Sequence, residues 1–300
     1  MEAVLLRTLL SSIKITALVF AMMLLTDVVN VKTAGAVGRL LRGGRWRQYV
    51  VAAFLGATPG CLGAFLAAYL YAHGFLSFGA IVAAMVATSG DESFVMFQVF
   101  PLKALGLHAL LFVVGVLSGW LSDEVAAAVG LRRSEACPLA ERCDECPPSL
   151  SWLALPGLVA PNPEDGEKRW HFAREHVWGH IVKGHLWRVF LWTFVALLLV
   201  KVLVRQGPLS EFVRGHLNWT LLPLAALVGL VPESGPHMVF VFLHKEGLAP
   251  FSVLLASSVV QDGHGMLPLL ALCPRDALLV KVFNFAIGLS LGGLLLLLGL

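Results

Sequence analysis

The sequence predicts an all-α polytopic membrane protein whose membrane part consists of two repeated halves. Three observations support this fold class: the composition, the length of the apolar runs and a match between the halves. Of 300 residues, 58% are hydrophobic and only 14% are charged, against roughly 25% charged in an average soluble domain. The net charge of +3 gives no reason to expect a nucleic-acid partner. We therefore expect a lipid bilayer as the surroundings of this chain.

A helix needs about 20 apolar residues to cross about 30 Å of hydrocarbon. Eight regions approach this length: 13–31, 48–72, 75–100, 104–121, 186–204, 218–243, 248–272 and 278–299. A polar stretch separates the fourth region from the fifth, which gives three parts: a first transmembrane repeat (1–121), an aqueous loop with Cys and His (122–183) and a second transmembrane repeat (184–300). We expect a multi-pass protein of the inner cell membrane. We expect no cleaved signal peptide, since the N-terminus lacks a small-residue cleavage site.

The two halves match when the sequence is shifted by 173 residues. Residues 56–119 then fall on 229–292 without a gap, and fourteen positions are identical. Most of the informative identities are glycines and prolines, such as Gly90 with Gly263 and Pro101 with Pro274. A duplicated membrane unit is the common plan of secondary transporters.

Four apolar regions are interrupted, at matching places in the two halves. The interruptions are GATPGCLG (56–63), ATSGDESF (87–94), GLVPESGPH (229–237) and VVQDGHGM (259–266). Proline removes a backbone donor, and glycine gives the chain freedom to unwind. We interpret them as helix breaks at Pro59, Gly60, Gly90, Pro232, Gly235, Pro236 and Gly263. The alternative is that glycine and proline serve helix packing and that the polar groups lie at helix ends in the interface.

The polar side chains of the membrane part gather at these breaks. Acidic and imidazole groups come from Asp91, Glu92, Glu233, His237, Asp262 and His264, and further polar groups come from Thr58, Ser93, Ser234 and Gln261. A carboxylate at the bilayer centre costs at least ~2.5 kcal/mol. Few basic side chains are near, because Lys103 and Lys245 lie close to segment ends. A bound cation or protons would supply the missing positive charge, and oxygen with imidazole suits divalent ions such as Mn²⁺ or Zn²⁺.

The aqueous loop offers a second set of metal-type ligands. Cys137, Cys143 and Cys146 form a C-x5-C-x2-C array, while His176 and His180 stand one helical turn apart. Three thiolates could hold a metal with one further ligand, or two of them could form a disulfide outside the cytoplasm. The histidine segment also fits an amphipathic helix at the membrane surface. The functional and structural interpretations both stay open.

Membrane orientation depends on how many times each half crosses. The basic loop 32–48 is expected in the cytoplasm by the positive-inside rule. Four complete crossings per half would give parallel repeats. If one broken region per half doubles back, the halves are inverted and the Cys/His loop faces the cytoplasm, which its own basic residues favour. A homo-oligomer is left open.

The four interruptions carry a resemblance to a known family. GATPGCLGAF, SGDESFVM, PESGPH and QDGHGMLPLLA are similar to signature stretches of the ten-helix heavy-metal exporters, a family that carries the names arsenic efflux protein and manganese transporter. The resemblance covers nearly the whole membrane part. It implies ten helices, so two of the eight regions would be split, one per half.

These observations predict a secondary transporter that exports a Mn²⁺-like divalent cation in exchange for protons, with the metal as cargo and no resident cofactor. No phosphate-binding loop is present, so ATP hydrolysis is not expected. One alternative is efflux of arsenic species, for which Cys61 and Cys273 are the thiols in the membrane part. The other is an intramembrane metal-dependent hydrolase using Glu233 and His237, although Pro236 between them disfavours a regular helix there.

Overall fold

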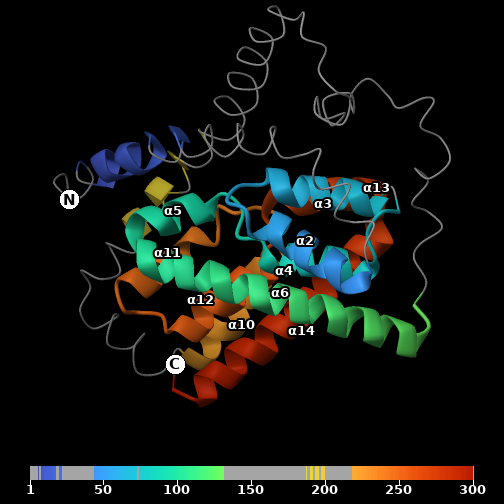
Figure 1. Cartoon of the computed structure of the whole chain (residues 1–300). Coiled ribbons are helices and arrows are strands. Elements are labelled where there is room, and N and C mark those ends of the chain that lie inside the picture. The colour runs from blue at the N-terminus through green and yellow to red at the C-terminus, as the bar shows by residue number, and fades with distance from the viewer. Residues whose placement is uncertain are drawn as a thin grey trace, which may run out of the picture.

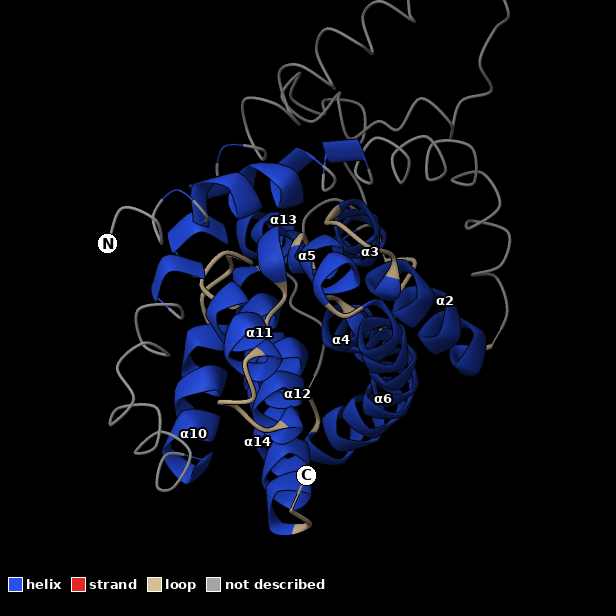
Figure 2. Ribbon diagram, turned by 90° about the vertical axis from the view of Figure 1, so that its left-hand side faces the viewer, coloured by secondary structure: helices blue, strands red, loops and turns tan. Residues whose placement is uncertain are grey.

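The structure is a computed structural model that describes residues 44–131 and 218–299, apart from residue 73, together with scattered positions in 6–21 and 187–199. Every regular element among the described residues is helical (Figures 1 and 2). The loop candidates Cys137, Cys143, Cys146, His176 and His180 lie outside the described residues.

Each half contributes the same order of helices. The first half contains α2 (Arg45–Ala57), α3 (Leu62–Ala72), α4 (Phe78–Ala87), α5 (Glu92–Val99) and α6 (Pro101–Val129). The second half contains α10 (Asn218–Gly229), α11 (Met238–Lys245), α12 (Phe251–Val260), the 3₁₀ turn η5 (Gly263–Gly265), α13 (Met266–Leu272) and α14 (Pro274–Leu297). The apolar regions predicted at 48–72, 75–100, 218–243 and 248–272 therefore each hold two helices.

The helix bounds follow the 173-residue shift. Helices α4 and α12 begin and end 173 residues apart, and so do the first residues of α2 and α10 and of α6 and α14. Gly74 and Gly247, also 173 apart, both have positive φ, of 82° and 69°, and follow α3 and α11. The same punctuating residues thus end the same elements in both halves.

Helix α6 is longer than the sequence indicates. It begins at Pro101, whose fixed φ suits a first helical position, and ends eight residues beyond the predicted 121. Gly130 ends the helix with a φ of 70°. The amides of Gly130 and Leu131 donate to the carbonyls of Ala127 (3.2 Å) and Ala126 (2.8 Å), the pattern of a Schellman motif. Residues 122–129, which we assigned to the aqueous loop, are therefore the last two turns of α6.

The two halves lie side by side, and short helices of one half pack against short helices of the other. Helix α4 packs against α2 and α6, and α12 packs against α10 and α14 (Figure 2). The shorter helices cross over, because α3 packs against α13 and α5 against α11. A hydrogen bond of 2.7 Å from the Tyr71 hydroxyl to Asp276 also links α3 to α14. The breaks of both halves are consequently brought to the middle of the molecule.

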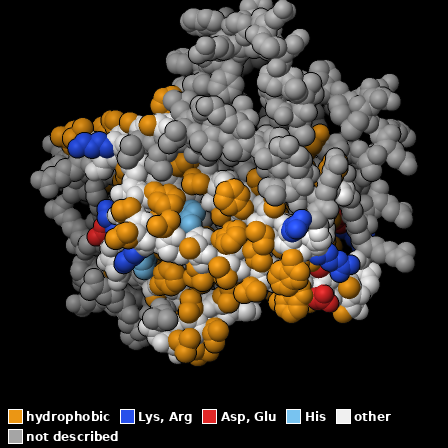
Figure 3. All heavy atoms as spheres, viewed as in Figure 1, with side chains coloured by type: hydrophobic (Ala, Val, Ile, Leu, Met, Phe, Trp, Pro, Cys, Tyr) orange, Lys and Arg blue, Asp and Glu red, His pale blue; other side chains and the backbone are white. Residues whose placement is uncertain are grey.

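Three stretches of the described chain are long and apolar enough to cross a membrane: Phe78–Val99, Pro101–Val129 and Pro274–Leu297. Of an 18-residue apolar window in the first stretch, which holds α4 and α5, 94% is buried in the protein, whereas 28% is buried in the corresponding window of the third. Outer side chains of α6, including Leu102, Leu105 and Leu117, are exposed. The face in Figure 3 is mostly hydrophobic over the described elements, with charged side chains near its left and right edges. This distribution fits a multi-pass membrane protein with α4 and α5 in its interior.

Candidate functional site

The site begins where the chain unwinds between α4 and α5 and between α12 and α13. Thr88 and Gln261 end α4 and α12 with extended backbone. Gly90 and Gly263 then take φ values of 53° and 52°, a region that glycine enters without steric cost. The two glycines face each other, since a Cβ placed on Gly263 would lie 3.5 Å from the Gly90 Cα. We call this contact the glycine crossing.

The other two breaks also reach the glycine crossing. The Gly60 amide donates to the Gly90 carbonyl at 3.2 Å. Ser234 lies against both crossing glycines: a Cβ on Gly263 would come within 2.7 Å of its Oγ, and one on Gly90 would clash with it. The Ser234 Oγ is buried and has no hydrogen-bond partner among the described residues. All four interruptions therefore meet at one place.

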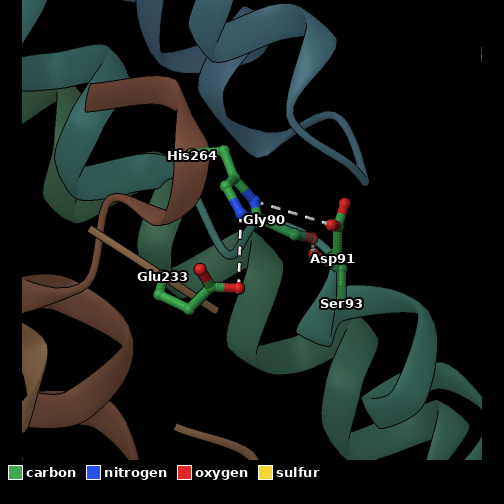
Figure 4. Close-up of polar contacts among 5 residues, drawn as sticks. All are labelled: Gly90, Asp91, Ser93, Glu233 and His264. Carbon is green, nitrogen blue, oxygen red and sulfur yellow. Dashed lines mark hydrogen bonds and ion pairs between the residues drawn. The ribbon is translucent and has the colours of Figure 1, made fainter. Parts of the chain in front are cut away.

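His264 lies between two carboxylates beside the crossing (Figure 4). Its Nδ1 is 3.8 Å from Asp91 Oδ2, and its Nε2 is 3.3 Å from Glu233 Oε1. The side chains of His264 and Asp91 are 7% and 3% exposed, while that of Glu233 is 26% exposed. Asp91 belongs to the first half and the other two to the second, so the group exists only because the halves meet. Glu233 is its most accessible member.

Glu92 and Gln261 form a second link between the halves. The Gln261 Nε2 donates to Glu92 Oε1 at 3.2 Å, and both residues are buried. Glu92 Oε2 and Gln261 Oε1 find no hydrogen-bond partner in the described part of the chain. A buried polar atom without a partner costs about 1–3 kcal/mol. These oxygens are thus the kind of group that a bound proton or cation would stabilise.

Asp262 corrects one expectation from the sequence. Its Oδ2 forms an ion pair with the Lys281 ammonium, and its Oδ1 accepts a 2.6 Å hydrogen bond from Asn284. We expected few basic side chains near the carboxylates of the breaks and did not count Lys281, which pairs with this one. Lys281 and Asn284 are residues of the candidate site that sequence reasoning missed. A signal existed: both polar residues interrupt the last apolar run, three positions apart on one helix face.

Three of the predicted site residues make bonds outside these groups. The His237 Nδ1 lies 3.0 Å from Ser257 Oγ, on α12. The hydroxyls of Thr58 and Ser93 donate to the carbonyls of Leu55 (2.6 Å) and Gly90 (2.7 Å), close to them in the chain. Thr58 therefore satisfies a carbonyl in the last turn of α2, and Ser93 satisfies a carbonyl of the unwound stretch before α5.

The predicted break residues lie between the helices. Pro59 and Gly60 are in the non-helical stretch that separates α2 from α3. Pro232, Gly235 and Pro236 are in the stretch between α10 and α11. Their placement leaves Ser234 and Glu233 on backbone that is not helical, beside the glycine crossing.

The family described as "Putative, 10TM heavy-metal exporter" matches residues 3–146 and 187–292, which include every residue of the glycine crossing. The chain belongs to this family. A comparison with curated proteins gave no match. A comparison with solved structures also gave no match. The expected resemblance to the ten-helix heavy-metal exporters is confirmed.

In this heavy-metal exporter family member, the described residues hold no group of three or more His, Cys, Asp or Glu side chains placed to bind a metal together. The possible metal-binding side chains lie in two pairs that share one histidine: His264 with Asp91, and His264 with Glu233. Each pair can share a proton. Binding of a metal ion there would require further side chains to turn toward it.

The hydrolase alternative needs Glu233 and His237 at one metal. In this exporter family member the two side chains make different contacts, since Glu233 faces His264 while His237 faces Ser257. The bend at Pro236 separates them instead of placing them on one face of a helix. Among the described residues, Glu233 and His237 therefore do not form the shared metal site that a hydrolase would need.

Proposed function

We propose that this chain is a secondary transporter that exports a Mn²⁺-like divalent cation from the cell across the inner membrane in exchange for protons. The observation that carries this proposal is the group of His264, Asp91 and Glu233, the first two of them buried, at the contact between the two halves. Interrupted helices at corresponding places in two repeats are where transporters bind their ions.

The chemistry of the donors supports exchange of a metal for protons. Carboxylate oxygen and imidazole nitrogen suit borderline and hard divalent ions. The same atoms must lose protons before they can bind a metal, so metal binding releases protons. His264 Nε2 and Glu233 Oε1 lie 3.3 Å apart, so this pair of atoms would bind either one proton or one metal ion.

We further propose that the halves are inverted repeats with discontinuous transmembrane helices at α4–α5 and α12–α13. The shared helix bounds at a 173-residue shift support the repeat. The crossed packing of α3 with α13 and α5 with α11 supports a site that both halves build. Movement of one half against the other would then expose that site alternately to the two sides.

Arsenic species remain the second cargo to test. Neutral arsenite would favour thiols over carboxylates, and Cys61 is a half-buried thiol beside the first break. The crossing itself presents Asp91, Glu92 and Glu233, which a neutral cargo does not need. We therefore expect that Cys61→Ser retains export of the metal.

The experiment is metal accumulation in cells that express the wild-type chain or the Asp91→Asn, Glu92→Gln double variant, over a panel of Mn²⁺, Fe²⁺, Co²⁺, Zn²⁺ and arsenite. The wild type should lower the cell content of one divalent metal, and the double variant should not. Glu246→Gln is the matched control, because Glu246 is an exposed carboxylate that follows the last residue of α11, outside the four breaks. If no metal distinguishes wild type from the double variant at equal membrane expression, the proposal fails.

A further inference from the structure

Asp262 is closed to a cation in the observed arrangement. The carboxylate is fully buried. Lys281 holds one of its oxygens and Asn284 the other. A metal ion that uses Asp262 as a ligand must therefore displace the Lys281 ammonium, because two cations cannot share the same buried oxygen without strong repulsion.

The fold itself does not require this ion pair. Under the 173-residue shift, Asp262 falls on Ser89 and Lys281 falls on His108. The first half builds the same helices with those residues, and the His108 Nδ1 bonds to the carbonyl of Ala104 on its own helix at 2.8 Å. Buried ion pairs often cost as much in desolvation as they return in attraction. The pair is thus a feature of the second half alone, beyond what helix packing needs.

Lys281 has a second partner that would keep it in place after it leaves Asp262. Its ammonium also donates to the Gly229 carbonyl at 3.2 Å. Gly229 is the last residue of α10, and the carbonyls at a helix C-terminus attract positive charge. The ammonium can therefore lose Asp262 without becoming a buried charge with no acceptor.

We propose that Lys281 is a tethered competitor of the transported cation: its ammonium occupies Asp262, yields it to the arriving divalent ion and returns when that ion leaves. This inference rests on the proposed function. It assigns Lys281 a role in selectivity as well, because a doubly charged ion gains more at Asp262 than the ammonium does, whereas Na⁺ or K⁺ carries no such advantage.

The test is calorimetric titration of the purified full-length protein with Mn²⁺. Removal of the competitor in Lys281→Gln should tighten Mn²⁺ binding by about tenfold or more, and Asp262→Asn should weaken it. Lys281→Arg keeps the charge and should stay within about threefold of wild type. A purely structural lysine would instead give weaker binding in Lys281→Gln, so unchanged or weaker binding there overturns the inference.

A double variant keeps the test decisive if Lys281→Gln does not fold with Asp262 left unpaired. Lys281→Gln with Asp262→Asn removes both charges, and its Mn²⁺ affinity should exceed that of Asp262→Asn alone by less than about threefold, since the tethered ammonium then only repels the ion and no longer competes for the carboxylate. A larger difference overturns the inference. If the wild type binds and transports no metal of the panel, the proposed function fails and the inference falls with it; if only the Lys281 variants disagree, the proposed function stands.

Discussion

Gly90 and Gly263 show that the absence of a Cβ atom sets the geometry of the site. Both have positive φ, and both approach Ser234 more closely than a side chain would permit. A Cβ at either position would meet the Ser234 hydroxyl and would also hold the backbone in a region that costs about 1–2 kcal/mol for residues other than glycine. These two glycines are therefore required by contact as well as by conformation.

Replacement of either crossing glycine should damage stability and transport together. We expect Gly90→Ala and Gly263→Ala to lower the free energy of unfolding by about 1–3 kcal/mol and to abolish metal export, measured by thermal unfolding in detergent and by metal accumulation. Gly106→Ala is the control, because no atom lies within 4 Å of a Cβ there. Removal of the Ser234 hydroxyl in Gly90→Ala, Ser234→Ala should recover part of the stability. Equal melting of Gly90→Ala and Gly106→Ala would contradict this account.

The contact between α4 and α6 shows how small residues and one carboxylate hold the interior helix in place. Gly115, Gly119 and Asp123 lie at four-residue intervals on one face of α6. Gly119 lets the two backbones approach, since its Cβ would come within 2.7 Å of the Gly79 carbonyl. The Asp123 carboxylate accepts hydrogen bonds from the Tyr49 hydroxyl (2.7 Å), the Ser77 hydroxyl (2.7 Å) and the Gly79 amide (2.6 Å). Asp123 thereby ties α2 and the first turn of α4 to α6.

Loss of this carboxylate should loosen all three helices. Asp123→Ala leaves the hydroxyls of Tyr49 and Ser77 without their acceptor, and we expect a loss of about 1–3 kcal/mol in the free energy of unfolding. Glu124→Ala, at the adjacent exposed position, should change stability by less than about 0.5 kcal/mol. Thermal unfolding of the two variants in the same detergent compares them directly. A shared melting temperature would show that the Asp123 contacts contribute nothing.

At the scale of the whole molecule, the two halves depend on each other for their central packing. Helices α3 and α5 of the first half pack against α13 and α11 of the second. Figure 1 shows α3 and α13 together at one side of the molecule and α5 and α11 together at another. Neither half alone would bury these short helices or bring Asp91 to His264.

Inverted halves predict opposite sidedness for equivalent residues. Trp46 and Trp219 are 173 residues apart, lie in the first turns of α2 and α10 and are 55% and 58% exposed. In Trp46→Cys and Trp219→Cys, a membrane-impermeant thiol reagent should label one position from outside the cell and the other only in inverted vesicles. The labelling of the unsubstituted chain is subtracted from that of each variant. Parallel halves would place both cysteines on the same side, which would overturn the inverted arrangement.

The apolar segments, the repeat and the helix breaks could all be predicted from the sequence alone. These properties are local: hydropathy depends on composition, and the breaks depend on the backbone chemistry of residues such as Pro59, Gly90 and Gly263. The matching Pro101 and Pro274 were also found from the sequence, but the predicted segments began at 104 and 278, whereas α6 and α14 begin at the prolines themselves. We placed the end of α6 too early because charged residues such as Asp123 and Glu124 are typical of an aqueous loop. The contacts of Asp123 with α2 and α4 show that these residues belong to the helix.

Which polar groups meet depends on the packing of the helices and could not be predicted from the sequence. Sequence reasoning treated six acidic and imidazole residues as one set, yet His264 faces Asp91 and Glu233 while His237 turns to Ser257. It also missed Lys281, whose partner Asp262 lies on a different element. A periodicity fixes the face of one helix, but partners between helices depend on how those helices cross and rotate. That geometry arises only when both halves pack around the glycine crossing.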